Sequence, residues 1–300
     1  MRSNKEAITK SPEPFVKWAG GKRQLIKQIE DYLPLELKNG YITRYIEPFV
    51  GGGAVLFHVA QLYNIEELFI FDINPELIVA YQTIKNNLED LLEILSKLAT
   101  EYLLLNEEKR KEYFYEMRSQ FNLFRKEPNY NKIKITALLI FLNRTCFNGL
   151  FRVNSRGEFN VPCGKYKNPT ICNSANLKAV SNILQKARIE LGDFEKCEKY
   201  VNKKSFVYFD PPYKPISNTS NFTAYAKDNF GDREQLRLRD FFTLLDRKDA
   251  KLMLSNSDSE DLFFENAYRE FIIEKVKARR NINSNGQKRG TIKEILIMNY

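Results

Sequence analysis

Two kinds of apolar pattern alternate along the first part of the chain. Residues 41–50 and 67–73 are short, mostly apolar runs with the length of buried strands, and the first of them leads into three glycines, Gly51–Gly53. Residues 54–63 and 75–98 instead space their apolar side chains as one face of a helix does. Strand, glycine turn, helix and strand make a βαβ unit, which predicts a parallel sheet.

The middle of the chain has a different pattern. Residues 88–142 have helical spacing and many charges, and residues 143–169 are rich in turn formers with aromatic and cationic side chains between them. Strand-like runs then resume at residues 206–210, 251–255, 270–276 and 294–299. A sheet that begins, is interrupted by a long helical stretch and then resumes predicts an α/β domain that carries an inserted module.

The composition excludes several classes of protein. Of the 300 residues, 43% are hydrophobic and 28% are charged, which is typical of a folded globular chain and not of a disordered, collagen-like or disulfide-rich one. The apolar run at residues 135–142 is far shorter than the roughly 20 residues that span a membrane. The first residues are too polar for the core of a signal peptide, so we expect a cytoplasmic protein that contacts no membrane.

The charge balance indicates a class of binding partner. The chain has 47 lysines and arginines against 38 acidic residues, a net charge of +9, and such an excess favours binding to a polyanion. Residues 275–293 hold seven cations and no acid, and they lie between two predicted strands. This stretch is either a loop on nucleic-acid phosphates or a solvated hairpin. Its candidate phosphate contacts are Arg279, Arg280, Lys288 and Arg289.

The chain offers no pattern of metal ligands. It has four cysteines without a Cys-x-x-Cys pair, and its single histidine is His58. A zinc site needs closely spaced cysteine or histidine ligands, so we expect no metal and four reduced thiols. His58 lies in the helix predicted after the glycine turn, where we expect a helix residue rather than a general base.

The glycine turn and the end of the second strand indicate a nucleoside site, because ligands of open parallel sheets bind at the carboxyl ends of strands. Gly51–Gly53 let the backbone approach a ligand, and a carboxylate at Asp72 can accept hydrogen bonds from ribose hydroxyls. The turn lacks the lysine and hydroxyl of a phosphate-binding loop, and Leu56 replaces the third glycine of a dinucleotide fingerprint. A nucleoside without phosphates fits best, a structural tight turn stays open, and a dehydrogenase is the weakest alternative.

A second candidate ligand motif precedes the first strand. In residues 15–22 (FVKWAGGK), Trp18, a glycine pair and Lys22 could clamp a zwitterionic ligand, with the lysine on its carboxylate. A tryptophan beside a turn is also common in a core, so the motif alone leaves both interpretations open.

The most specific motif is Asp210-Pro211-Pro212-Tyr213, which follows a strand-like run. Two consecutive prolines fix the backbone and remove two N–H donors. Asp210 and a neighbouring carbonyl then form two acceptors suited to an exocyclic amino group. Tyr213 offers a flat face on which a flipped base can stack.

These motifs occur in a known order. FVKWAGGK, EPFVGGGAVLF, FDINPEL, GDF and FDPPY resemble the conserved blocks of the Dam-type (D12 class) DNA adenine-N6 methyltransferases, over roughly residues 15–300. Residues 141–169 also resemble the target-recognition region of the GATC-specific members. The resemblance implies an α/β fold with a Rossmann-like methyltransferase sheet, mostly parallel with an antiparallel closing strand, and an inserted, largely helical recognition domain. The implied domains are a flexible N-terminus at 1–12, a catalytic domain at 13–90 and 190–300, and the insertion at 91–189.

The resemblance also implies roles for individual residues. The catalytic residues would be Asp210, Pro211, Pro212 and Tyr213. The contacts to the methyl donor, S-adenosylmethionine, would be Trp18, Lys22, Glu47, Pro48, Phe49, Gly51, Gly53, Asp72, Asp193, Phe194 and Asp210. The contacts to DNA would be Lys17, Asn148, Leu150, Arg152, Pro162 and Tyr166. Arg152 suits a guanine, because a guanidinium can bond O6 and N7 together, whereas Leu150 and Pro162 also fit a role in shaping the loop.

The implied reaction transfers a methyl group from S-adenosylmethionine to N6 of an adenine flipped out of double-stranded DNA, within GATC. Asp210 and the Pro211 carbonyl would stabilise the positive charge that grows on N6, and a proton would leave after methylation. The alternatives are methylation of cytosine N4 or of RNA, and a DNA-binding relative without catalysis. A separately acting restriction endonuclease is a partner compatible with the resemblance, and we expect a monomer or weak dimer.

Overall fold

The described residues fold into two compact units. The computed structural model describes the chain except residues 1–10, 215–229, 260 and 280–290, and except the side chains of residues 278, 279 and 291–293. The sheet unit comprises the described residues of Lys22–Val50, Ala54–Ile73 and Glu190–Tyr300. The helical unit comprises those of Met1–Gly21, Gly51–Gly53 and Asn74–Ile189.

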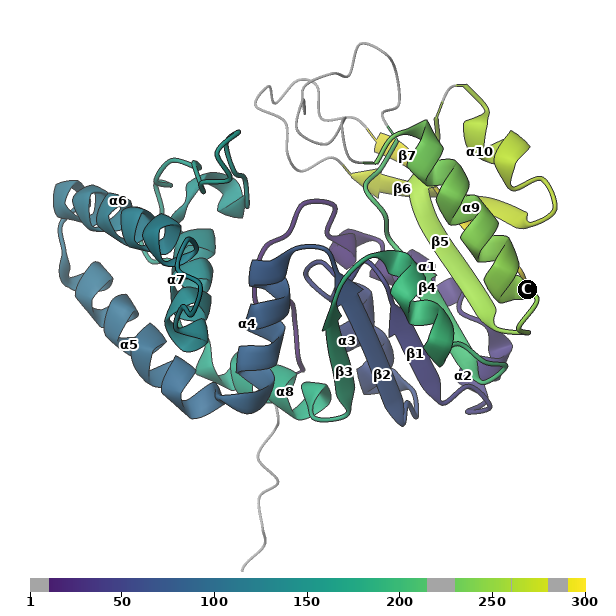
Figure 1. Cartoon of the computed structure of the whole chain (residues 1–300), viewed down its shortest axis with the longest axis horizontal. Helices are drawn as coiled ribbons and strands as arrows, with labels where there is room; N and C mark the ends of the chain where they lie inside the picture. Colours follow the sequence, from purple (N-terminus) through teal and green to yellow (C-terminus); the bar gives the residue numbers. More distant parts are fainter. Residues whose placement is uncertain (1–10, 215–229, 260, 280–290) are drawn as a thin grey trace, which may run out of the picture. The chain divides into compact units, whose positions relative to one another are not determined.

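A seven-stranded sheet runs in the order β3-β2-β1-β4-β5-β7-β6 (Figure 1). Its strands are β1 (Arg44–Glu47), β2 (Glu67–Asp72), β3 (Ala187–Leu191), β4 (Ser205–Phe209), β5 (Lys251–Ser257), β6 (Ile272–Arg279) and β7 (Thr291–Met298). β1 pairs in parallel with β2 and β4, and β4 does so with β5, whereas β7 pairs antiparallel with β5 and β6. The predicted α/β fold with a mostly parallel sheet and an antiparallel closing strand is confirmed.

The two faces of the sheet carry different side chains, because successive residues of a strand point to opposite faces. On one face, Ile46, Val207 and Phe209 join a large buried cluster with α9 (Asp232–Asp246) and α10 (Phe263–Ala267). The residues that alternate with this set include polar ones near the strand ends: Tyr45, Glu47, Tyr208, Ser255 and Glu294. The aromatic core therefore covers one face of the sheet, and the candidate chemistry lies on the other.

Short helices complete the sheet unit: η1 (Lys22–Gln24), α1 (Ile26–Asp31), α2 (Leu35–Lys38), α3 (Ala54–Leu62) and η3 (Phe194–Tyr200). α3 is the helix predicted after the glycine turn. It carries His58, whose Nε2 bonds the carboxylate of Glu30 on α1. His58 is thus a helix residue, as expected.

The helical unit contains α4 (Pro75–Asn86), α5 (Leu88–Leu104), α6 (Glu107–Phe124), α7 (Lys132–Thr145), η2 (Phe147–Gly149) and α8 (Ser174–Leu184). α7 packs against α4, α5 and α6 and is buried along most of its length. Its central run, ITALLIFL, is apolar all round, which is the pattern of a helix enclosed by others. The predicted helical middle of the chain is therefore built around α7.

One predicted helix differs in the structure, and several elements of the structure are not predicted. The helix predicted over residues 75–98 is two helices, because Asn87 leaves the helical region with φ −136° and ψ 42°. An asparagine side chain competes with helical backbone bonds, which makes this a natural break. The sequence patterns do not predict α8, β3 or α9. β3 alternates apolar with charged residues, as befits its place at an edge of the sheet.

No helix among the described residues is both long and apolar enough to cross a membrane. β6 and β7 pair antiparallel on either side of residues 280–290, so the two ends of the cationic stretch, residues 275–279 and 291–293, lie in paired strands. Arg280, Lys288 and Arg289 lie outside the described residues, as does the side chain of Arg279. Their contact with phosphates stays a prediction.

Candidate catalytic site and recognition hairpin

Asp210 lies at the carboxyl end of β4, a fully buried strand between β1 and β5. Its Oδ1 is 2.6 Å from Nζ of Lys22 in η1, and the two side chains are 19% and 4% exposed. The hydroxyl of Ser255 on β5 donates to the same oxygen over 3.1 Å, and the Tyr208 hydroxyl lies 2.9 Å from that of Ser255. The structure thus joins two residues predicted from separate motifs, Lys22 and Asp210, in one ion pair.

The surroundings of Asp210 set its charge. Burial raises the pKa of Asp210 above its ordinary value, and the Lys22 ammonium and the Ser255 hydroxyl oppose that rise. A buried charge needs a partner of opposite sign, which Lys22 supplies. Because both partners bind Oδ1, Oδ2 is the oxygen without a bonding partner among the described residues.

Two buried amides fix the loop that follows Asp210. Gln235 of α9 donates from Nε2 to the carbonyl oxygen of Pro212 over 2.9 Å. Asn256 of β5 accepts from the backbone N–H of Lys214 over 3.1 Å and lies 3.3 Å from Gln235 Oε1. Gln235 and Asn256 are 1% and 0% exposed. The sequence analysis missed both residues, and the available signal was a polar side chain where the pattern of a buried helix face or strand favours an apolar one.

Tyr213 is held at its hydroxyl and at its ring. The hydroxyl donates to Oε2 of Glu294 on β7 over 2.6 Å. Nζ of Lys22 lies 4.4 Å from the centre of the ring, within the range of a cation–π contact. Glu294 is a third residue that the sequence patterns do not single out, because it follows Lys293 in the closing strand and its contact with Tyr213 arises only in the fold.

Glu47, a predicted donor contact, is buried at the end of β1. It is 3% exposed, and the hydroxyl of Tyr45 donates to its Oε2 over 2.7 Å. Burial raises the pKa of Glu47 well above its usual range, while the bond from Tyr45 opposes that rise and the charge of Asp210 adds to it. Glu47 therefore belongs to the same polar network as Asp210 and Lys22.

The other predicted donor contacts of the sheet unit gather near the ends of β2 and η3. The carbonyl of Asp72 accepts from the amide of the glycine that precedes Asp193, over 3.0 Å. Asp193 caps η3, and the ring of Phe194 lies 5.5 Å from that of Phe49, which follows the buried Pro48. The backbone of Asp72 thus meets the turn that leads into η3, where the Asp193 carboxylate pairs with Arg237 at 2.5 Å.

In the helical unit, Trp18 packs on the glycine turn. Gly51 has φ +46°, and a Cβ there would lie 3.0 Å from Cδ1 of Trp18, so a larger residue would push the indole away. The carbonyl of Gly51 accepts from the hydroxyl of Tyr81 over 3.0 Å, and Gly53 has φ +72°. The predicted donor contacts Trp18, Gly51 and Gly53 are therefore neighbours within this unit.

The residues predicted to contact DNA, apart from Lys17, lie in residues 146–166, which we name the recognition hairpin. Isolated bridges join its arms at Cys146 with Cys163 and at Val153 with Phe159. The exposed predicted contacts are Asn148, Arg152 and Pro162, and the partly buried ones are Leu150 and Tyr166. A polar and cationic side-chain set is thus presented outward from a defined scaffold.

Two contacts orient the hairpin's side chains. Arg152 donates from Nε to Oδ1 of Asn160 over 2.8 Å. Phe151 stacks on Trp18 with ring centres 5.3 Å apart and an interplanar angle of 22°. Phe151 has no role in the sequence analysis, yet it joins the recognition hairpin to the motif around Trp18.

Side chains of α6 hold the backbone of the recognition hairpin. Asn122 accepts from the N–H of Phe159 over 2.7 Å and donates to its carbonyl over 3.0 Å. Arg118 and Arg125 donate to two further carbonyls of the hairpin. Arg118 of α6 and Arg125, the residue that follows the helix, therefore have a scaffolding role in the structure.

Asn143 connects Lys17 to the hairpin. Its Oδ1 accepts from the N–H of Lys17 over 2.8 Å, and its Nδ2 donates to the carbonyls of Lys17 and Gly149, each over 2.9 Å. Nζ of Lys17 lies 5.1 Å from the centre of the Tyr166 ring. Asn143 is 1% exposed, so it is a buried amide with three backbone partners.

We expect Asn143→Ala to lower the free energy of unfolding by about 2–4 kcal/mol. The substitution leaves buried backbone groups without hydrogen-bond partners, and each such group costs about 1–3 kcal/mol of stability. Chemical denaturation followed by circular dichroism measures this change. The control is Gln82→Ala, which removes one longer bond, of 3.3 Å, to a carbonyl at Ile189. Equal losses for the two variants would contradict a special role of Asn143.

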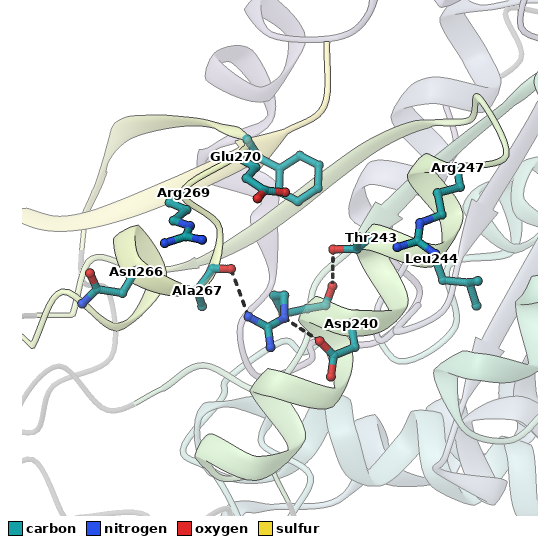
Figure 2. Close-up of a pocket in the computed structure, with 10 residues that line it drawn as sticks. Asp240, Thr243, Leu244, Arg247, Asn266, Ala267, Arg269 and Glu270 are labelled. Carbon is teal, nitrogen blue, oxygen red and sulfur yellow. Dashed lines mark hydrogen bonds and ion pairs between the residues drawn. The ribbon is translucent and has the colours of Figure 1, made fainter.

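Among the described residues, no group of three or more His, Cys, Asp or Glu side chains is arranged to hold a metal ion. An open pocket of the sheet unit lies between α9 and the segment that includes the end of α10 (Figure 2). Within it, Arg239 pairs with Asp240 at 2.6 Å and Thr243 bonds a backbone carbonyl. None of the predicted site residues lines this pocket, so it does not bear on the predicted chemistry.

Comparison with known proteins shows the family of the chain. The family described as "D12 class N6 adenine-specific DNA methyltransferase" matches residues 18–282. The type II methyltransferase M.MjaIII of Methanocaldococcus jannaschii is 53% identical over 96% of this chain and 99% of its own length. A type II methyltransferase of Lactococcus lactis, M1.LlaDCHI, is 40% identical over 96% of this chain and 95% of its own. The DNA adenine methylase of Escherichia coli K12 is 33% identical over 96% of each chain.

The chain belongs to the D12 class of N6 adenine-specific DNA methyltransferases. It is therefore an enzyme that methylates adenine in DNA, and the family expected from the sequence motifs is confirmed. The relatives include type II methyltransferases.

Proposed function

We propose that the chain transfers a methyl group from S-adenosylmethionine to N6 of an adenine flipped out of double-stranded DNA, within GATC. The observation that carries the proposal is Asp210, a buried acceptor at the end of β4 that is charge-matched by Lys22 at 2.6 Å. We assign catalysis to residues 13–90 and 190–300 and target recognition to residues 91–189.

Asp210 acts on the amino group of the adenine. Its Oδ2 accepts a hydrogen bond from N6–H, and the Pro211 carbonyl is the second acceptor. The N6 lone pair is delocalised into the ring, and two acceptors favour the tetrahedral geometry in which it can attack. As the bond to the methyl group forms, N6 gains positive charge, which the Asp210 carboxylate stabilises. A proton then leaves N6, so no strong base is required.

The donor supplies an electrophilic methyl group on a sulfonium sulfur. The residues at the ends of β2 and η3 fit its adenosine part, because carboxylates at Asp72 and Asp193 suit hydroxyl and amino donors, and the rings of Phe49 and Phe194 suit a base. For Lys22 we propose the role of holding Asp210 ionised. The roles of Glu47, Pro48, Trp18, Gly51 and Gly53 at the donor rest on the family resemblance.

Target recognition is assigned to Lys17 and to Asn148, Leu150, Arg152, Pro162 and Tyr166 of the recognition hairpin. Exposure of Asn148, Arg152 and Pro162 supports contacts with bases, and the bond from Arg152 to Asn160 supports a fixed guanidinium. The choice of GATC rests on the resemblance of residues 141–169 to GATC-specific relatives.

The test is methyl transfer from labelled S-adenosylmethionine to unmethylated DNA, with the modified bases mapped by sequencing. We expect N6-methyladenine confined to GATC. Methyladenine at other sequences would agree with the role of Asp210 in catalysis and would overturn the proposed recognition of GATC by the recognition hairpin. Label in cytosine or only in RNA, or no label despite binding of the donor, would overturn the proposed reaction.

The rate of methyl transfer should fall as the pH is lowered. Asp210 acts as a carboxylate, and burial raises its pKa above the ordinary 3.8, so the active ionised form is present above that raised pKa and is lost below it. Because the Lys22 ammonium lowers the pKa of Asp210, Lys22→Met should move the inflection to higher pH. Single-turnover rates against pH measure both, with circular dichroism to show that the protein stays folded. An inflection that does not move in Lys22→Met would contradict the coupling.

A further inference from the structure

Tyr213 is fixed by residues from two other elements of the sheet unit. Its hydroxyl donates to Oε2 of Glu294 on β7 over 2.6 Å, and Nζ of Lys22 in η1 lies 4.4 Å from its ring centre. A tyrosine side chain turns about two bonds, and its hydroxyl lies on the axis of the second, so a bond to the hydroxyl fixes the direction in which the ring points. The ammonium of Lys22 against the ring face restrains the rotation of the ring about that axis. Glu294 thus determines where the ring lies.

The register of the sheet brings Glu294 to this place. β7 pairs antiparallel with β5, and Glu294 lies opposite Ser257. Ile295 and Ile297 of the same strand join the aromatic core on the opposite face, so Glu294 lies on the face that carries Ser255. The closing strand therefore brings one carboxylate to the loop that follows β4.

A carboxylate at position 294 is unfavourable for the stability of the fold unless it has a function. Burial raises the pKa of Glu294 above its ordinary value, and the positive charge of Lys22 and the bond from Tyr213 oppose the rise. Desolvating a carboxylate costs free energy, and an apolar side chain would match its neighbours in β7. The partners that offset this loss, Tyr213 and Lys22, both belong to the proposed active site.

We propose that Glu294 is a positioning residue for methyl transfer, which acts by holding the ring of Tyr213 in the orientation on which the target adenine stacks. The inference rests on the proposed function, because it assumes that a flipped adenine is the base that meets Tyr213. The Lys22 ammonium occupies one face of the ring, and the adenine stacks on the other. Glu294 touches neither the base nor the donor, and its effect passes through the tyrosine hydroxyl.

This role predicts a specific pattern of variants. Glu294→Ala should lower the single-turnover rate of methyl transfer about tenfold, within the range set by base–aromatic stacking energies, and leave the dissociation constant for DNA within about threefold. Glu294→Gln should retain most of the rate, because its amide oxygen still accepts from the Tyr213 hydroxyl. Tyr213→Phe, which keeps the ring and loses the hydroxyl, should show nearly the same loss as Glu294→Ala.

The decisive experiment is a double-mutant cycle on the full chain with S-adenosylmethionine. The rates of Glu294→Ala, Tyr213→Phe and the double variant are measured on duplex DNA, and the target adenine is replaced by 2-aminopurine in a parallel fluorescence assay. We expect the double variant to be no slower than either single one, with the same change in 2-aminopurine emission in all three. The matched control is Glu265→Gln, which removes a carboxylate that pairs with Lys275 at 3.6 Å in the same unit and should leave the rate unchanged.

The outcomes separate this inference from the proposed function. If wild type fails to methylate adenine, the proposed function fails. If wild type is active and the losses in the double variant multiply, or if Glu294→Gln is as slow as Glu294→Ala, the positioning role fails. Thermal unfolding of each variant distinguishes a misfolded protein from a slow one. If Glu294→Ala does not fold, the role still requires that Tyr213→Phe is slow and that Glu294→Gln is not, and a Tyr213→Phe rate equal to that of wild type would overturn it.

Discussion

Asp210→Ala is expected to abolish detectable methyl transfer, with a loss of at least about a hundredfold to a thousandfold in the single-turnover rate, while DNA binding is largely preserved. Removing one preorganised group that stabilises transition-state charge has effects of about this size. The carboxylate meets positive charge that develops on N6 only during transfer, so its loss raises the barrier more than it weakens the ground-state complex.

Asp210→Ala also changes the protein around it, because Lys22 is 4% exposed and loses its ion-pair partner. Breaking one side of a buried ion pair destabilises a protein by about 3–5 kcal/mol, which could mimic a catalytic loss. Asp210→Asn keeps an oxygen acceptor without the charge, and Lys22→Met combined with Asp210→Asn removes both charges together. We expect all three variants to be slow and the last to recover stability.

The measurements are single-turnover transfer of label, DNA affinity by fluorescence anisotropy and unfolding by denaturant. A rate close to that of wild type in Asp210→Asn would show that the charge of the carboxylate is not used. Recovery of the rate together with stability in the double variant would show that the defect of Asp210→Asn is structural. Loss of rate with intact folding and DNA affinity is the result that the mechanism requires.

The sequence predicts most of the sheet because its strands are regular. β1, β2, β4 and β5 have the apolar runs that buried parallel strands require, and the glycine turn after β1 marks the first βαβ unit. The antiparallel strands β6 and β7 have shorter apolar runs, at the start of β6 and at the end of β7. β3 escapes prediction because Arg188 and Glu190 interrupt its apolar pattern, as an edge position allows. Asn87 divides a continuous apolar period into α4 and α5, and a period alone does not reveal such a break.

Local motifs identify the candidate site only in part. Asp210 and Lys22 each stand out by their neighbours in the sequence, but their pairing depends on η1 meeting the end of β4 in the fold. Gln235, Asn256 and Glu294 contact the loop after β4 through long-range bonds, so nothing beside them in the sequence marks them. A buried polar residue in an apolar pattern is the one signal that all three share.

Arg152→Ala is expected to relax recognition at one base pair of the target by about tenfold to a hundredfold, since a bidentate arginine–guanine contact discriminates by about 1–3 kcal/mol. Arg152 bonds Asn160 through Nε, and in the proposed contact its two terminal nitrogens would face O6 and N7 of a guanine. Arg152→Lys should also lose discrimination, because an ammonium keeps the charge and loses the planar fork.

The control for charge is Arg156→Ala, because Arg156 lies in the same hairpin, is 78% exposed and pairs with Glu158 at 3.4 Å. Neutralising either arginine removes one cation from the proposed DNA-binding surface, so both variants should weaken binding to all sequences by a similar small factor. Only Arg152→Ala should change the ratio of rates between the target and a duplex with one substituted guanine. Equal ratios in the two variants would reassign Arg152 to the phosphate backbone, because contacts to phosphates orient a protein on DNA and carry no direct information on sequence.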